Sequence, residues 1–361
     1  MSKVERPAAY LGRQAGESFQ RYLSDGRPYD LDAAIELWEK AAQRSDAASP
    51  DLGDHLGMLG IALRMRFERT ESRSDLDGAL EAESAGIACS SQGSANLAMY
   101  LDALGVIRAY RYRLTREPFE IDGAIAAHEN ALLAARRAQS LPASTAQIYH
   151  NLGMDHWHKY EAEERSRDLE LALEAWTHAV DLFESTDAER IEHALTLADG
   201  LAARSRVNNN VGDLRAAVAL RADSFIKMSG RSPDLLAQYH HLGTELLELY
   251  ERAGDPMDLS RAISTWDTAA NIARALGGPD VSPTMHNLGA ARLLLYQQTN
   301  RIMDLEAAIA AFEEALWSWS SDGPDGEEHR LSLAQALEER HRRTGSQSDQ
   351  ARAANLRGPA G

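Results

Sequence analysis

The stretch NLGAARLLLYQQTNRIMDLEAAIAAF, residues 287–312, contains the pattern that decides the fold. Its Leu-Gly pair is followed seven residues later by Tyr296, and fifteen residues after the glycine by the signature Asp-Leu-Glu-Ala-Ala-Ile (304–309). Phe312 stands eight residues beyond the aspartate that opens this signature. Good helix formers lie on both sides of a short polar turn, which predicts two antiparallel helices.

The same pattern recurs along the chain, with intervals of 48, 45, 48, 47, 43 and 46 residues between its glycines. These glycines are Gly12, Gly60, Gly105, Gly153, Gly200, Gly243 and Gly289. The signature opens at Asp30, Asp75, Glu120, Asp168, Asp213, Asp258 and Asp304. A repeat of this length predicts an array of helical hairpins, each of which buries its apolar face against its neighbours.

Three positions of the repeat have an expected structural role. The glycine is predicted to lie mid-helix, where its missing side chain lets the partner helix approach; in an isolated helix it costs about 1 kcal/mol relative to alanine. The acid that opens the signature is predicted to cap the second helix. Eight residues beyond that acid, four copies carry an aromatic residue that we expect to be a buried core anchor: Trp38, Trp176, Trp266 and Phe312.

The expected architecture is therefore an all-α, right-handed α-solenoid of about seven helical hairpins plus a C-terminal capping helix. Residues 1–345 are predicted to form one continuous superhelical array, and residues 346–361 a capping helix and a frayed tail. Within these ranges, 331–343 is predicted to be one more first helix and 349–357 the capping helix. No alternating Val/Ile/Thr run of strand length occurs in the chain.

Composition excludes several classes of protein. The 38 basic and 55 acidic residues give a net charge of −17, which disfavours a nucleic acid or an anionic membrane as partner. There is no run of 18 apolar residues and no apolar N-terminal segment, so we expect a soluble, cytoplasmic protein. A single cysteine, Cys89, excludes an internal disulfide framework and any multi-cysteine zinc site.

The repeat resembles a known superfamily. The Leu-Gly pair, the Tyr seven residues later and the small residues of the second helix are similar to tetratricopeptide (TPR) repeats, although the usual unit is 34 residues long and this one is longer. The motifs 151–153 and 287–289 (Asn-Leu-Gly) and 250–252 (Tyr-Glu-Arg) resemble the long-unit arrays found N-terminal to caspase-like CHAT proteases in actinobacteria and fungi. No protease domain follows residue 350, so this resemblance implies an effector protein acting in trans.

Catalytic signatures are absent from the sequence. It contains no Gly-x-x-x-x-Gly-Lys-Ser/Thr phosphate loop, no Gly-x-Gly-x-x-Gly after a strand and no His-Glu-x-x-His. We therefore expect a non-enzymatic protein with no cofactor.

The resemblance to TPR arrays also implies which positions face a concave groove, because first helices line that surface. On the mapped positions we expect a groove that binds a protein or peptide, with these residues as candidates: Tyr110, His150, Trp157, His158, Arg204, His240, Glu248 and His286. The alternative is that the histidines before the glycines hydrogen-bond the backbone of the adjacent repeat. A metal site is not expected, because helices of successive repeats stand about 10 Å apart, too far for their imidazoles to share an ion.

Three functions stay open at this point. The first is a protein- or peptide-binding scaffold, and the second a sensor or regulatory subunit of a bacterial defence or signalling system that acts with a separate CHAT-like effector. The third is a small-molecule-binding protein or an enzyme that uses the His-lined groove as a pocket. The sequence leaves the partner and the oligomeric state open.

Overall fold

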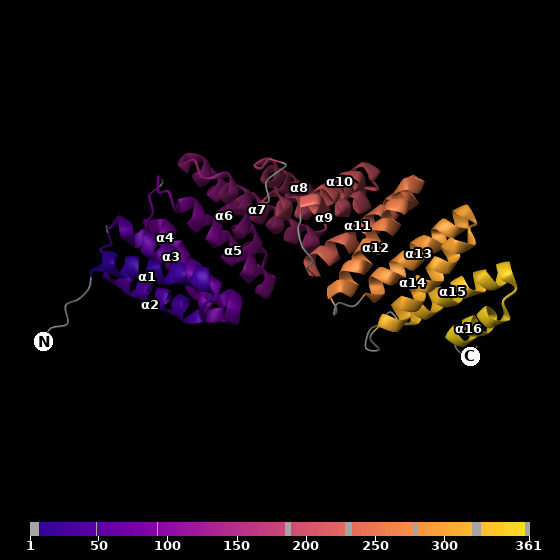
Figure 1. Cartoon of the computed structure of the whole chain (residues 1–361). Coiled ribbons are helices and arrows are strands. Elements are labelled where there is room, and N and C mark those ends of the chain that lie inside the picture. Colours follow the sequence, from indigo (N-terminus) through magenta and orange to yellow (C-terminus); the bar gives the residue numbers. More distant parts are fainter. Residues whose placement is uncertain are drawn as a thin grey trace. The chain divides into compact units, whose positions relative to one another are not determined.

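The computed structural model describes residues 7–47, 49–91, 93–184, 189–227, 233–276, 281–319 and 326–357. Within these ranges there are sixteen α-helices and no strand, so the all-α prediction is confirmed. The chain divides into two compact units, Met1–His193 and Ala194–Gly361, and in each of them successive helical hairpins stack side by side (Figure 1). The predicted frayed tail, 358–361, lies outside the described residues.

In the first unit, each odd-numbered helix packs on the helix that follows it, which gives four hairpins. The helices are α1 (Ala8–Asp25), α2 (Pro28–Arg44), α3 (Pro50–Thr70), α4 (Arg73–Cys89), α5 (Leu97–Thr115), α6 (Pro118–Ala138), α7 (Pro142–Glu163) and α8 (Ser166–Asp181).

The second unit continues the pattern with α9 (Arg190–Asn208, residues 194–208 of which belong to this unit), α10 (Val211–Lys227), α11 (Pro233–Ala253), α12 (Pro256–Leu276), α13 (Ser282–Thr299), α14 (Ile302–Ser318), α15 (Gly326–Thr344) and α16 (Gln347–Arg357). The predicted capping helix is α16, which packs on α15 as the second helix of a hairpin. None of the helices in the described ranges combines the length and the apolar character that crossing a bilayer requires.

In five hairpins the first helix ends three residues after the recurring aromatic residue (Phe67, Tyr112, Tyr160, Tyr250 and Tyr296). Four residues after Phe67, Glu71 adopts a left-handed conformation (φ 56°), and its N–H donates a hydrogen bond of 2.7 Å to the Phe67 carbonyl oxygen. Gly254 forms the same turn on Tyr250 with φ 74°. A left-handed residue at this point closes the helix and reverses the chain within a few residues, which fixes the length of the turn.

The prediction that the signature acid caps the second helix is wrong. The second helices begin two residues earlier, often at a proline such as Pro28, whose missing N–H is no loss in a first turn. The acid is therefore the third helical residue, and in four hairpins it forms an ion pair with an arginine of the preceding first helix, as does Asp349, the third residue of α16. These pairs are Arg21–Asp30, Arg66–Asp75, Arg111–Glu120, Arg204–Asp213 and Arg340–Asp349. A largely buried carboxylate needs such a partner, and arginine offers two parallel donors.

The repeating glycine allows the second helix to place a large side chain directly on the first helix. A Cβ atom on Gly243 would lie 2.5 Å from the Trp266 ring, and one on Gly289 would lie 2.7 Å from Phe312. The four predicted aromatic anchors are all buried, with exposed fractions of 0% to 3%, so their assignment as core residues is confirmed. The glycine and the anchor together set the distance between the two helices.

We expect Gly243→Ala to lower the free energy of unfolding by about 1–3 kcal/mol, because the added methyl group collides with a ring that close packing holds in place. The matched control is Gly16→Ala in α1, where an added Cβ meets nothing within 4 Å. That change should be neutral or stabilise by about 0.5–1 kcal/mol through helix propensity. Urea denaturation followed by circular dichroism measures both. Equal effects of the two substitutions would contradict the role given to Gly243.

Candidate functional site

Three hairpins carry a polar residue at the anchor position in place of the aromatic one. These residues are Glu83, His128 and Arg221, each eight residues after its signature acid, and their exposed fractions are 0%, 1% and 0%. Only the aromatic residues at the anchor position were predicted from the sequence to be buried. The same eight-residue spacing from the signature acid could have identified these three polar residues as buried too.

Two of these polar anchors receive a charged partner from the first helix of the next hairpin. Nδ1 of His128 lies 2.7 Å from Oδ2 of Asp155, and Arg221 donates two hydrogen bonds, of 3.0 Å and 2.8 Å, to Glu245. Asp155 and Glu245 both stand two residues after the glycine of their own repeat. At these two boundaries the anchor and this position therefore meet, and each polar anchor is paired there with a carboxylate.

Glu83 has no such partner within the described ranges. The matching position in the next hairpin is Ile107, which is fully buried and apolar, and neither carboxyl oxygen of Glu83 forms a hydrogen bond among the described residues. Burial raises the pKa of the Glu83 carboxyl well above its ordinary value, because it penalises the charged form.

Replacing Glu83 by methionine should raise the free energy of unfolding at pH about 7 by about 1–3 kcal/mol, because it removes an unsatisfied buried carboxyl group. A carboxyl whose folded pKa is raised costs stability as the pH rises above its unfolded pKa. The gain should therefore shrink as the pH falls toward about 4.5. Urea denaturation at several pH values measures this, with Glu81→Met, on the exposed side of the same helix, as the control.

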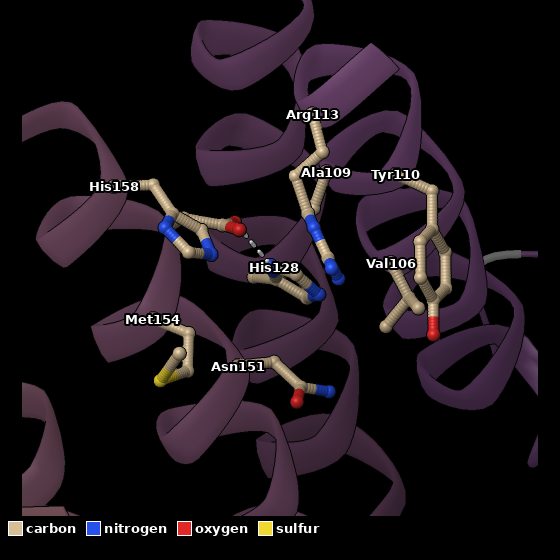
Figure 2. A pocket seen from close by; sticks show the side chains of 9 residues that line it. Val106, Ala109, Tyr110, Arg113, His128, Asn151, Met154 and His158 are labelled. Atoms are coloured by element: carbon tan, nitrogen blue, oxygen red, sulfur yellow. Dashed lines mark hydrogen bonds and ion pairs between the residues drawn. The ribbon is translucent and has the colours of Figure 1, made fainter. Parts of the chain in front are cut away.

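A pocket of about 240 Å³ opens beside His128, between α5 and α7. Its wall consists of Val106, Ala109, Tyr110, Arg113, His128, Asn151, Met154, Asp155 and His158. Figure 2 shows Arg113 reaching toward His128 between His158 and Tyr110. All of these residues belong to the first unit.

The buried imidazole of His128 is held at one nitrogen only. Because an ionised Asp155 can only accept hydrogen bonds, Nδ1 of His128 is the donor in their contact, and this fixes the orientation of the ring. Nε2 has no hydrogen-bond partner among the described residues; Oδ1 of Asp102 lies 3.5 Å away and instead accepts a hydrogen bond from Asn151. Burial by itself lowers the pKa of His128, but the hydrogen bond and charge of Asp155, with the charge of Asp102, raise it above its ordinary value.

Two further groups in the wall can donate hydrogen bonds. Arg113 is exposed, its guanidinium lies 5.6 Å from the Tyr110 ring centroid, and it forms no ion pair within the described part of the chain. Nδ1 of His158 lies 3.2 Å from Glu161, so Nε2 is the His158 nitrogen that can form a hydrogen bond in the pocket. The Tyr110 hydroxyl donates to Glu68 over 3.0 Å, which fixes the ring. The pocket thus combines an arginine and two histidines with a small apolar wall.

Of the eight candidate residues from the sequence, only Tyr110 and His158 line this pocket. Arg204 is held by Asp213, and Glu248 by Arg206 and Arg252. The Trp157 ring packs against Trp176 and Tyr160, with centroids 5.9 Å and 5.7 Å apart. The part that these six other residues take in binding stays a prediction.

The histidines three residues before the glycines contact the next first helix. Nδ1 of His150 lies 3.4 Å from Nδ1 of His193, and Nδ1 of His286 lies 2.9 Å from Nδ1 of His329. His240 approaches Thr284 in the same way, at 3.3 Å from the hydroxyl. The neighbouring repeat therefore contributes side chains to these contacts, where the sequence predicted its backbone.

The expectation that imidazoles of successive repeats stay too far apart to share an ion is also wrong, because side chains three residues before each glycine reach across to the next helix. Within the described ranges, no group of three or more His, Cys, Asp or Glu side chains is arranged to hold a metal ion.

The His150–His193 contact should make the first unit sensitive to acid. Burial, and for His150 also the charge of His193, lowers the pKa of both imidazoles, so the folded chain binds fewer protons than the unfolded chain. Their contribution to stability is present above pH about 6.5 and is lost as the pH falls below it. His193→Asn should reduce the acid-induced loss by about 1 kcal/mol, measured as the change in Tm between neutral and mildly acidic buffer. His178→Asn, at an exposed position, should leave this change as in the unmodified chain.

No family model matches the chain, and no curated protein matches it in sequence. Among solved structures, the C-terminal part of a TPR repeat-containing protein from Cytophaga hutchinsonii is similar, with a TM-score of 0.57 and 13% identity over 89% of this chain and 98% of that one. The apo form of RapI is similar with a TM-score of 0.55 and 12% identity, over 96% of this chain and 85% of that one. Identities this low show the fold alone, which is a TPR-like stack of helical hairpins.

Proposed function

We propose that this chain is a non-enzymatic scaffold that binds an extended protein or peptide segment across α3, α5 and α7. The observation that carries the proposal is a second pocket, of about 680 Å³, next to the His128 pocket. It is lined by Phe67, Glu68, Glu71, Arg73, Tyr110, Arg113, Leu114 and Arg116. Tyr110 and Arg113 belong to the walls of both pockets, so the two pockets adjoin, and together they are called here the binding groove.

The binding groove is built like a surface for an extended segment. Arrays of stacked hairpins present long surfaces of this kind, and rigid aromatic side chains contribute much of the binding energy at such surfaces. The Tyr110 ring is half-buried, packs edge-on against Phe67 with centroids 5.4 Å apart, and is fixed by its hydrogen bond to Glu68. A ring held in place in this way loses little conformational entropy when a partner covers it.

The charge of the binding groove differs from that of the whole chain. In the larger pocket, Arg73, Arg113 and Arg116 outnumber Glu68 and Glu71, although the chain carries a net charge of −17. A positive excess at one place on an acidic protein favours segments with negative charge and disfavours basic ones.

The test uses the full-length chain as bait for a displayed library of random linear peptides. We expect peptides to be enriched, and we expect Arg113→Glu to weaken the binding of a synthetic enriched peptide at least about tenfold, because it reverses a charge in the wall shared by the two pockets. Fluorescence polarisation measures the affinity. Arg215→Glu, an exposed reversal of the same kind on α10, is the matched control and should change little.

The result against the proposal is that the unmodified chain enriches no peptide, or that the two charge reversals have the same effect. Circular dichroism of both variants shows that they keep their helices.

Two narrower proposals are consistent with the same groove. The pocket beside His128 could also hold a small polar ligand, and a thermal-shift screen of small anions would detect it. The resemblance of the repeat to CHAT-associated arrays supports a cytoplasmic regulatory role with an effector in trans. In that case the chain should alter the activity of a co-expressed CHAT-like protease, and Arg113→Glu should abolish the change.

A further inference from the structure

One ring nitrogen of His128, Nε2, is buried without a hydrogen-bond partner among the described residues. The His128 side chain is 1% exposed and lies in the wall of the pocket. A buried polar atom without a partner is costly, and such atoms are usually satisfied by a protein group, a water or a ligand. Nε2 can accept one hydrogen bond as a neutral imidazole or donate one when protonated.

The other donors of the pocket converge on the same space. Figure 2 shows the Arg113 guanidinium close to the His128 ring, with the His158 ring beside it. Arg113 forms no ion pair in the described part of the chain, and His158 has Nε2 left after its contact with Glu161. An arginine and two imidazoles around one space favour a planar anion such as a carboxylate, which arginine can bind through two parallel hydrogen bonds.

Part of the wall beside these donors is apolar. Val106, Ala109 and Met154 line the pocket beside these donors, and its volume of about 240 Å³ limits the occupant to a side chain or a molecule of similar size. An aspartate or glutamate side chain matches both properties, because its methylene groups can contact the apolar wall while its carboxylate reaches the donors.

We propose that the pocket around His128 is a proton-coupled receptor for one acidic side chain, aspartate or glutamate, of the segment bound in the groove. The carboxylate lies between His128, Arg113 and His158, and one proton enters from solvent to reside on Nε2 of His128. This inference rests on the proposed function, since the acidic residue belongs to the bound segment.

The proton is required by the charges that face His128. From α5 these are Asp102 and Arg113, and from α7 they are Asp155 and His158. With His128 neutral, a third carboxylate would face two aspartates with one arginine to offset them. With His128 protonated, its Nδ1 binds Asp155 and its Nε2 binds the incoming carboxylate, so every polar atom of the ring has a partner. The hydrogen bond and charge of Asp155, together with the charge of Asp102, outweigh burial and raise the pKa of His128, which favours this proton.

The experiment compares pairs of peptides on the full-length chain. An enriched peptide is synthesised with both ends blocked, once with its acidic residue and once with Gln or Asn in its place. At pH about 6.5 the acidic peptide should bind about tenfold more tightly, because it makes hydrogen bonds to charged donors. As the pH rises toward about 8.5 its affinity should fall, at a limiting slope of about tenfold per pH unit for one linked proton, while the affinity of the amide peptide should change little.

Proton uptake supplies a second measurement that needs no variant. Calorimetry in two buffers of different ionisation enthalpy should show up to one proton taken up per acidic peptide bound, and none for the amide peptide. His128→Gln should remove the pH dependence, and His158→Gln, at a less buried site, should weaken binding while keeping a pH dependence.

The outcomes separate the two proposals. If peptides bind but the acidic and amide forms bind equally, or if binding is lost when the peptide C-terminus is blocked, the acidic side-chain site is overturned and the scaffold function stands. If the acidic form binds more tightly without proton uptake, the role of His128 is overturned. If no peptide binds at all, the proposed function fails and this inference falls with it.

Discussion

The packing of five hairpins rests on one close contact, between a glycine of the first helix and the anchor residue of the second. At Gly243 the indole of Trp266 lies where a Cβ atom would be, and at Gly105 the imidazole of His128 does the same. Because the helices meet at a distance that only a missing side chain allows, the anchor must be flat or flexible and must be buried. Apolar anchors satisfy this requirement through packing alone.

Polar anchors change what the next hairpin must supply. Beside Trp38 and Trp266, the position two residues after the next glycine is alanine (Ala62, Ala291), and each alanine belongs to the same core cluster as the tryptophan. Beside His128 that position is Asp155, a carboxylate that holds one ring nitrogen, while the other is buried without a hydrogen-bond partner among the described residues. The candidate site is therefore a product of the packing scheme, at a polar anchor that also lines a pocket.

Periodicity predicted the parts of the structure that repeat. The glycines, the aromatic anchors and the recurring tyrosines identified the hairpins, because each hairpin solves the same packing problem with the same residue types. Errors came where one residue type has two uses. An acid near a helix start can cap the helix or, as Asp75 does, form an ion pair with an arginine nine residues upstream. For a histidine before a glycine, one expectation was a contact with the backbone of the next repeat, but His286 contacts the side chain of His329.

Spacing along the chain was enough to predict the all-α fold, the order of the seven hairpins that carry the repeat and the burial of their aromatic anchors. It did not predict the last hairpin, because α16 was expected only as a cap and packs on α15 as the second helix of a pair. Only the tertiary structure decided which buried charges meet and where a donor is left without a partner. Asp155 reaches His128 from 27 residues away and Asp102 from 26, and a hydrogen bond depends on less than an ångström of separation. Spacing along the chain fixes the helix face on which a side chain lies. Whether its nitrogen meets a carboxylate or faces a pocket is set by the packing of three helices.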